Sequence, residues 1–220
     1  MSTTASTTVP TAGSSRAADV PRPAGRGGLS AVSPAQAQRT FRATLEAMAR
    51  PGTLHRLLDV PGSHPPVSAV PLALADLMSP LAPLGPAEKD LTAELARITG
   101  APLTAPAEAR IVLGTAAPAA SAVHALPAGS AWEPERGALL AQHVVGLGTE
   151  PCETTDVVLR LAGPGVDGIR HLAVTGIDAD VVDARNLRCA AFPAGVDLVL
   201  VAADATVAAL PRTTRIEVLR

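Results

Sequence analysis

The sequence predicts a single mixed α/β domain, a three-layer sandwich in which a mixed sheet lies between layers of helices. Three observations indicate this fold. The chain has 220 residues, enough for one domain with a sizeable core. Strand-like apolar runs and segments of helical periodicity interleave without a strict strand–helix–strand repeat. The G-x-G-x-x-G sequence at residues 163–168 joins two strand-like runs and does not open a helix, so it does not support a dinucleotide-binding fold.

We expect the folded domain to span residues 29–220, after a disordered tail over residues 1–28. The tail consists mainly of Ser, Thr, Ala, Pro, Gly and Arg, with almost no large apolar side chains. Such a segment cannot bury enough surface to offset the entropy of ordering it.

The first predicted helix begins at Ser33 and Pro34, which suit the N-cap and the first helical position. Helical spacing continues through an apolar stripe of Ala37, Phe41, Leu45 and Met48. Pro51-Gly52 ends this helix, and Arg50 lies at the end where a cation favourably meets the helix dipole.

The next segments predict a short strand, a helix, and a second amphipathic helix. Residues 53–58 are strand-like, and the apolar run 70–78 favours a helix. Gly85-Pro86 opens a helix that Gly100 stops, with a core stripe of Leu91, Leu95 and Ile98.

The middle of the chain predicts further strands joined by loops. Residues 110–113 suit a strand, residues 116–128 a small-residue linker or loose helix, and residues 132–137 a turn. We expect strands over 157–161 and 169–174, which the turn Gly163-Pro164-Gly165 joins as a hairpin or as neighbours. Residues 178–188 then predict a helix.

The C-terminal stretch carries the clearest strand signals. Val196–Val201 is almost wholly apolar and suits a strand buried on both faces. A turn near residues 203–206 precedes the apolar Val207–Leu210, and Pro211 lies between strands because it lacks a backbone donor. Residues 216–218 alternate as a half-exposed strand does.

A polar cluster at residues 212–215 precedes this last strand, and two interpretations of it stay open. Period 2 places Arg212 and Thr214 on the face of Ile216, where a charge needs a partner. Arginine with neighbouring hydroxyls suits a carboxylate or phosphate ligand, so we name Arg212, Thr213, Thr214 and Arg50 as candidate anion-binding residues. Alternatively, Arg212 secures a turn or pairs with a carboxylate such as Asp197.

Composition argues against several classes of function. The only aromatic residues are Phe41, Trp132 and Phe192, and the net charge is −2, so nucleic-acid binding is disfavoured. The two cysteines and five histidines show no metal-ligand spacing, so we expect no metal. No apolar run reaches about 20 residues and no signal peptide is evident, which predicts a cytoplasmic protein that does not enter a membrane.

Two separated blocks resemble the PhnH family of the carbon–phosphorus (C–P) lyase system for phosphonate use. The first block is Gln38–Arg42 with Met48–Thr53, and the second is Phe192–Leu198 with Leu210–Thr214. The Gly163-Pro164-Gly165 turn is similar to that family too. The chain departs from the family pattern at Met78, where the family favours a second acid, and in an apparent insertion over residues 149–156.

The resemblance implies a fold related to pyridoxal-phosphate-dependent transferases but lacking that cofactor. Lys89 is the only lysine available for an internal aldimine, and it stands in a predicted surface turn, so we expect no cofactor. The resemblance also implies a homodimer that joins the core subunits PhnG, PhnI and PhnJ. That machinery couples an alkylphosphonate to the ribose of ATP, releasing adenine.

The leading hypothesis is a non-radical core subunit of this system, which contributes surface and anion contacts rather than the chemistry itself. In this role it supports formation of alpha-D-ribose 1-methylphosphonate 5-triphosphate from ATP and methylphosphonate. The alternative is a stand-alone protein that binds a phosphonate, phosphate or nucleotide through the Arg/Thr cluster. A third reading is an independent small-molecule enzyme using acids around Asp76 and Asp197.

Overall fold

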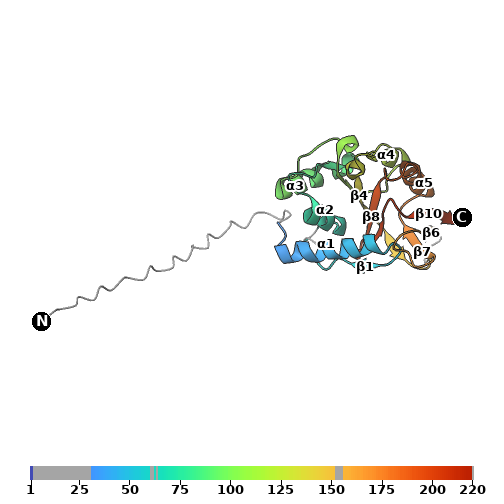
Figure 1. Cartoon of the computed structure of the whole chain (residues 1–220), viewed down its shortest axis with the longest axis horizontal. Coiled ribbons are helices and arrows are strands. Elements are labelled where there is room, and N and C mark those ends of the chain that lie inside the picture. Colours follow the sequence, from blue (N-terminus) through green and yellow to red (C-terminus); the bar gives the residue numbers. More distant parts are fainter. Residues whose placement is uncertain (2–30, 60–61, 63, 152–155, 220) are drawn as a thin grey trace.

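The computed structural model describes residues 1, 31–59, 62, 64–151 and 156–219. Within these ranges the chain forms one mixed six-stranded sheet, one antiparallel four-stranded sheet and five α-helices (Figure 1). The predicted mixed α/β class is therefore confirmed, and the separate antiparallel sheet was not foreseen. Residues 2–28 of the predicted tail and Cys152 lie outside the described residues.

The α-helices are α1 (Pro34–Ala49), α2 (Ala69–Leu74), α3 (Lys89–Thr99), α4 (Ala120–His124) and α5 (Ala179–Arg188). Short 3₁₀ helices are η1 (Pro66–Ser68), η2 (Pro86–Glu88), η3 (Pro106–Glu108) and η4 (Pro134–Arg136). The large sheet contains β1 (His55–Arg56), β2 (Leu81–Pro83), β3 (Ile111–Gly114), β4 (Leu139–Val144), β8 (Asp197–Ala202) and β9 (Thr206–Leu210). The small sheet contains β5 (Gly146–Gly148), β6 (Val157–Ala162), β7 (Arg170–Thr175) and β10 (Arg215–Leu219).

The large sheet has the order β1-β9-β8-β4-β3-β2, with β2, β3, β4 and β8 parallel and β9 antiparallel to β8. The small sheet has the order β10-β6-β7-β5 and is antiparallel throughout. β6 and β7 form the predicted hairpin through the Gly163-Pro164-Gly165 turn. Strand β8 is buried along five of its six residues, as its unbroken apolar sequence predicts.

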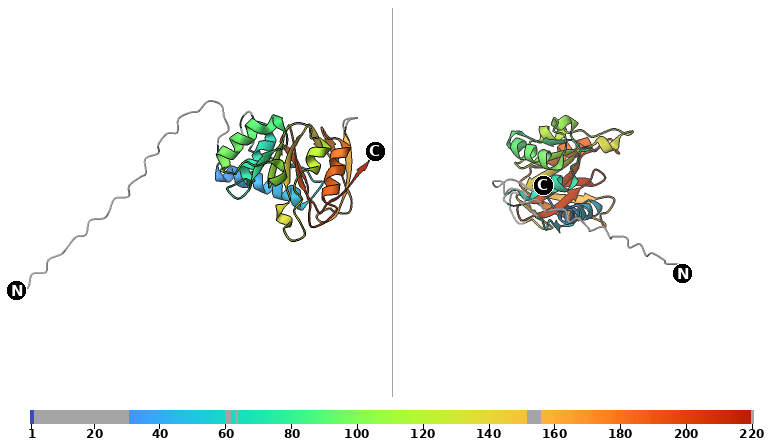
Figure 2. Two further views of the ribbon diagram at one scale, coloured as in Figure 1. Left: turned by 90° about the horizontal axis from the view of Figure 1, so that it is seen from above. Right: turned by 90° about the vertical axis from the view of Figure 1, so that its left-hand side faces the viewer.

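Two hydrophobic clusters occupy the two faces of the large sheet, because successive side chains of a strand point to opposite faces. On β8, Leu198 and Leu200 pack with α4, α5 and the small sheet, whereas Val199 and Val201 pack with α1, α2 and α3. Figure 1 shows β8 running between these two groups of elements. In the left view of Figure 2, the strands of the large sheet lie between the green α3 and the orange α5.

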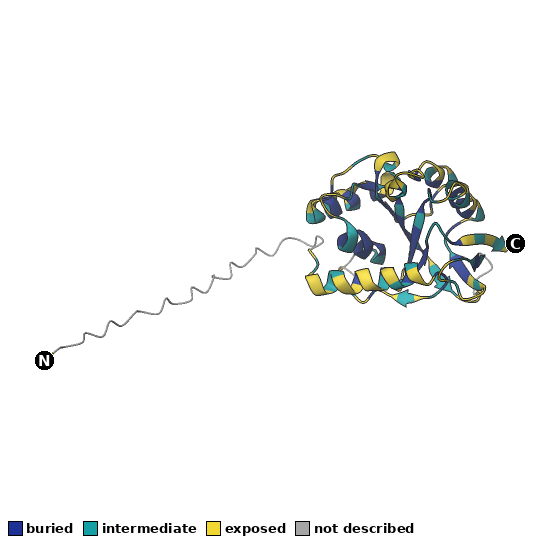
Figure 3. Cartoon of the chain, in the orientation of Figure 1, coloured by how far each residue is buried: buried dark blue, intermediate teal, exposed yellow. Residues whose placement is uncertain are grey.

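Helix α1 begins as predicted, with a capping box at its first turn. The Ser33 Oγ accepts from the Gln36 N–H at 3.3 Å, and the Gln36 Oε1 accepts from the Ser33 N–H at 2.8 Å. The buried face of α1 is offset from the predicted apolar stripe: Thr40, Thr44 and Ala47 are buried, while Phe41 and Leu45 are about half exposed. The outward face of α1 is mostly yellow in Figure 3.

Other elements differ from the sequence-based expectations mainly in extent. Helix α2 ends at Leu74, before the predicted end, and the expected strand over 53–58 shrinks to His55–Arg56. Strand β10 begins at Arg215, so the period-2 pattern does not extend back through Arg212 and Thr214 as predicted. Residues 212–214 form a turn instead, closed by the Thr214 N–H donating to the Pro211 carbonyl at 2.8 Å. None of the helices in the described ranges is long and apolar enough to cross a bilayer.

Candidate functional site

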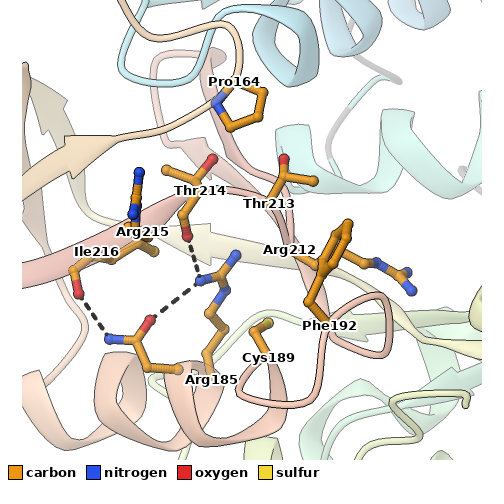
Figure 4. Close-up of a pocket in the computed structure, with 10 residues that line it drawn as sticks. Pro164, Arg185, Cys189, Phe192, Arg212, Thr213, Thr214, Arg215 and Ile216 are labelled. Atoms are coloured by element: carbon orange, nitrogen blue, oxygen red, sulfur yellow. Dashed lines mark hydrogen bonds between the residues drawn. The ribbon is translucent and has the colours of Figure 1, made fainter. Parts of the chain in front are cut away.

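A cavity of about 520 Å³ lies between the C-terminal end of α5 and the turn that joins β9 to β10 (Figure 4). Ten residues line it: Pro164, Arg185, Asn186, Cys189, Phe192, Arg212, Thr213, Thr214, Arg215 and Ile216. Three of the ten are arginines and none is a carboxylate. This cavity, called the α5 pocket below, contains three of the four candidate anion-binding residues.

Arg212 lies on one side of the α5 pocket, where hydrogen bonds to Asp197 and Pro134 hold its side chain. Its Nη2 donates to Asp197 Oδ2 at 2.6 Å, and its Nε lies 3.1 and 3.2 Å from the two carboxylate oxygens. Its backbone N–H also donates to Asp197 Oδ1 at 2.6 Å, and Nη1 donates to the Pro134 carbonyl at 2.5 Å. Both side chains are only 15% exposed. The ion pair expected as the structural alternative for Arg212 is confirmed.

Two glycines make room for Arg212. A Cβ at Gly195 would lie 2.7 Å from the Arg212 Cβ, and one at Gly137 would lie 2.7 Å from its Nη1. Real Cβ atoms do not approach other atoms so closely, so a larger side chain at either position displaces the arginine or the backbone. The second resemblance block therefore has a physical basis, because Gly195, Asp197 and Arg212 form one packed unit.

Arg185 is the charged residue that the sequence did not single out. It projects from α5, is 1% exposed, and donates to the carbonyl oxygens of Thr214, Leu210 and Pro211 and to the Asn186 Oδ1. All four acceptors are neutral. Burial lowers the pKa of Arg185, while the nearby Cys189 and Asp197 raise it and Arg212 lowers it. Figure 4 shows its guanidinium reaching from α5 to the turn that carries Thr214.

A signal for Arg185 was present in the sequence. Val181 and Val182 are buried on α5, and Arg185 follows them by four and three positions, so it shares their face. An arginine on the apolar stripe of a helix indicates a buried guanidinium with backbone partners.

The Gly163-Pro164-Gly165 turn approaches both resemblance blocks beside the α5 pocket. A Cβ at Gly165 would lie 2.1 Å from the Ala49 carbonyl oxygen at the end of α1, and one at Gly163 would lie 2.9 Å from the Thr213 carbonyl oxygen. The Gly163-Pro164-Gly165 turn is thus clamped between α1 and the turn before β10. Segments far apart in sequence are brought together here.

The structure assembles three of the predicted site residues and leaves one apart. Arg212, Thr213 and Thr214 all line the α5 pocket. Thr214 is 2% exposed, and its Oγ1 has no hydrogen-bond partner among the described residues. Arg50 is not among the lining residues; its side chain is 64% exposed and pairs with Glu46 at 2.8 Å.

The two acids of the third hypothesis are each engaged by neighbouring groups. Asp197 lines a smaller cavity of about 230 Å³ together with Ser79 and Arg212, and Asp76 is not among its lining residues. The Ser79 hydroxyl and the Met78 N–H donate to Asp76 and hold its pKa below the usual range. Asp197 is engaged by Arg212. Both carboxylates are thus occupied by local partners.

No cluster of three or more His, Cys, Asp or Glu residues suited to a metal occurs within the described part of the chain. Lys89 is exposed at the first residue of α3 and is not among the residues that line the α5 pocket.

Comparisons with known proteins place these features in a family. Residues 30–217 match the family model of the bacterial phosphonate metabolism protein PhnH. HtxG of Stutzerimonas stutzeri, named as a C-P lyase subunit protein, is 34% identical over 179 residues, covering 81% of this chain and 85% of HtxG. A Rhizobium meliloti (strain 1021) protein named alpha-D-ribose 1-methylphosphonate 5-triphosphate synthase subunit PhnH is 32% identical over 190 residues, covering 83% of this chain and 90% of that protein. Because the family model covers nearly the whole described domain, this chain belongs to the PhnH family of bacterial phosphonate metabolism proteins.

Proposed function

We propose that this chain is a non-radical core subunit of the C–P lyase system in phosphonate catabolism. In this role it supports formation of alpha-D-ribose 1-methylphosphonate 5-triphosphate from ATP and methylphosphonate. The observation that carries the proposal is the family match over residues 30–217, supported by a relative named as a subunit of the corresponding synthase. The proposal includes a cytoplasmic location, a homodimer, and PhnG, PhnI and PhnJ as partners.

The proposal assigns the chain a supporting role rather than the bond-breaking step. The most prominent charged residue of the second resemblance block, Arg212, is bound by Asp197 and by the Pro134 carbonyl, which suits a structural part in the fold. We also propose that the large sheet and its flanking helices form a three-layer arrangement related to the pyridoxal-phosphate-dependent transferases, used here without that cofactor.

Co-expression tests the assembly role directly. A tagged form of this chain would be produced with PhnG, PhnI and PhnJ from the same organism, and the eluted subunits identified by mass. We expect stable co-elution, and we expect a strain lacking this gene to lose growth on methylphosphonate as the sole phosphorus source. Elution of the tagged chain without these partners, together with normal growth of the deletion strain, would contradict the proposal.

A second candidate function is a site for an anionic small molecule such as a phosphate or nucleotide. It is favoured by one observation: three arginines and no carboxylate line the α5 pocket. Under this proposal Arg212, Thr213 and Thr214 contribute contacts, and Arg50 does so from outside the lining residues. Calorimetry with ATP on the wild type and on Arg212→Ala checks it, and no binding in either protein would sink it.

A further inference from the structure

The charge balance of the α5 pocket differs from what its three arginines suggest. Arg212 is neutralised by Asp197, which accepts from its guanidinium in three donor–acceptor pairs. Arg185 is buried with four neutral acceptors, so its charge has no carboxylate in contact. A buried charge without a counter-ion is unfavourable unless something compensates it. The pocket floor therefore carries a positive charge whose described hydrogen-bond acceptors are all neutral.

Besides the buried Thr214 hydroxyl, two polar groups on the pocket wall remain available to a ligand. Within the described part of the chain, neither the Thr213 hydroxyl nor the Arg215 guanidinium takes part in a hydrogen bond or ion pair. Thr213 is half-buried, and Arg215 is exposed at the start of β10. In Figure 4 both side chains extend toward the side of the pocket where Pro164 lies. A hydroxyl and a guanidinium together suit the oxygens of a phosphoryl or carboxylate group.

Part of the pocket wall is apolar. Phe192 is 65% exposed and lines the pocket, with Pro164 and Ile216 as further apolar neighbours. An exposed aromatic ring beside a cationic floor can cover the carbon part of a ligand while the charged end faces the arginines. The cavity of about 520 Å³ is within the usual size range for small-molecule pockets.

We propose that the α5 pocket binds an organic oxyanion, with Arg185 supplying charge from beneath, Thr213 and Arg215 contacting the oxyanion, and Phe192 covering the apolar part. This inference deepens the second candidate function and rests on it, but it assigns the binding to Arg185, Thr213 and Arg215 rather than to Arg212 and Arg50. Arg185 acts as a positioning residue, because its N–H groups hold the carbonyls of the turn that presents Thr213.

Cys189 provides a reporter inside the pocket. It is a half-buried free thiol that lines the cavity, and its Sγ donates only a long hydrogen bond of 3.5 Å to the Val196 carbonyl. In a Cys152→Ser background, Cys189 is the remaining thiol of the chain. Alkylation by anionic iodoacetate and by neutral iodoacetamide can be compared at the same thiol, so the rate ratio measures the local potential rather than thiol reactivity.

We expect the iodoacetate-to-iodoacetamide rate ratio at Cys189 to exceed that of free glutathione by roughly threefold or more, because a positive site concentrates anions. Arg215→Gln should lower the ratio. The matched control is Arg136→Gln, which removes an exposed arginine paired with Glu133 outside the pocket and should leave the ratio unchanged. A wild-type ratio no higher than that of glutathione would overturn the proposed charge balance.

Protection of Cys189 identifies the ligand class. Four probes are compared for protection of Cys189 against alkylation. Phenylphosphonate and benzoate distinguish a phosphoryl ligand from a carboxylate ligand. Inorganic phosphate tests the charged group alone, and benzyl alcohol tests the apolar part alone. We expect phenylphosphonate or benzoate to protect best, with Thr213→Val and Arg215→Gln each weakening binding about three- to tenfold. Phe192→Ala should remove the advantage of phenylphosphonate over inorganic phosphate. Equal protection by benzyl alcohol would overturn the proposal.

The paired variant Arg212→Gln/Asp197→Asn separates this inference from the function on which it rests. We expect the anionic probes still to protect Cys189 in this variant, because it removes one positive and one negative charge and leaves the net charge of the pocket unchanged. If it abolishes protection while Thr213→Val and Arg215→Gln do not, the anion site stands but the assignment made here is wrong. If no probe protects the wild type, both the site and the assignment fail, whereas the assembly role is judged separately by co-elution. Thermal unfolding of each variant confirms that it folds.

Discussion

The guanidinium of Arg212 donates to Asp197 and to the carbonyl of Pro134, so it joins β8, the η4 turn and the turn before β10. We expect Arg212→Leu and Asp197→Leu each to lower the free energy of unfolding by about 2 to 3 kcal/mol, because each leaves a largely buried charged partner without its hydrogen bonds. Urea unfolding measures this change.

The double variant Arg212→Leu/Asp197→Leu is the control for that pair. It should recover part of the loss, since neither charge is left unpaired. Single variants as stable as the wild type would show that the ion pair contributes little.

Glu88 is a second residue whose role is set by its hydrogen bonds. It is 3% exposed, and it accepts from the N–H groups of Gly85, Thr115 and Ala116 and from the Thr115 hydroxyl. Burial raises the pKa of Glu88, but these donors outweigh burial and leave the pKa below the reference value of 4.5. A depressed pKa stabilises the folded state above the unfolded pKa, and this contribution disappears as pH falls through the folded pKa.

We therefore expect Glu88→Gln to lower the free energy of unfolding by about 1 to 3 kcal/mol near neutral pH. The difference from wild type should shrink as the pH falls below the reference value of 4.5 and through the lower folded pKa. Urea titrations at a series of pH values measure it. Asp90→Asn, at an exposed carboxylate in the first turn of α3, serves as a comparison. A difference that stays constant on acidification would contradict the role assigned to Glu88.

At the scale of elements, the packing of α1 on the β6–β7 turn depends on Gly165. Its φ is +77°, and a Cβ there would lie 2.1 Å from the Ala49 carbonyl oxygen. Gly168 in the same connection also has a positive φ, of +63°, but a Cβ there meets nothing within 4 Å. The two glycines share the conformational requirement and differ in the contact with α1.

We expect Gly168→Ala to lower the free energy of unfolding by about 1 kcal/mol and Gly165→Ala by roughly 3 kcal/mol or more, the excess being the collision with the α1 backbone. Chemical denaturation of both variants checks this. Equal losses in the two proteins would show that α1 moves away at little cost.

Local signals predicted most elements because they depend on nearby residues. The cap at Ser33, the helix stop at Gly100 and the apolar run of β8 are examples. None of these signals needs a partner that is distant in the sequence. The membership of β10 in a second sheet could not be predicted, since its pairing with β6 joins residues far apart in the chain. The ion pair of Arg212 was anticipated as one alternative, but the burial of Arg185 depends on the turn that packs over α5.

At the scale of the whole molecule, the boundary between the predicted tail and the domain can be tested by truncation. Among the described residues, both hydrophobic clusters are built after position 31, with Val32 as the first contributor and Ala47 as the first fully buried one. Ser33 and Gln36 supply the cap of α1 from within the domain. A chain that begins at residue 29 therefore keeps every described contact of the fold.

We expect a chain of residues 29–220 to unfold within about 2 °C of the full-length protein, because a segment without a packed core contributes little to stability. A chain of residues 37–220 is the matched comparison. It removes Ser33 and the first turn of α1, which should lower the free energy of unfolding by at least about 1 kcal/mol. Differential scanning calorimetry on the three proteins measures both changes. A loss of several degrees in the first truncation would mean that residues before 29 pack on the domain, which would extend the folded unit toward the N-terminus and contradict the predicted boundary.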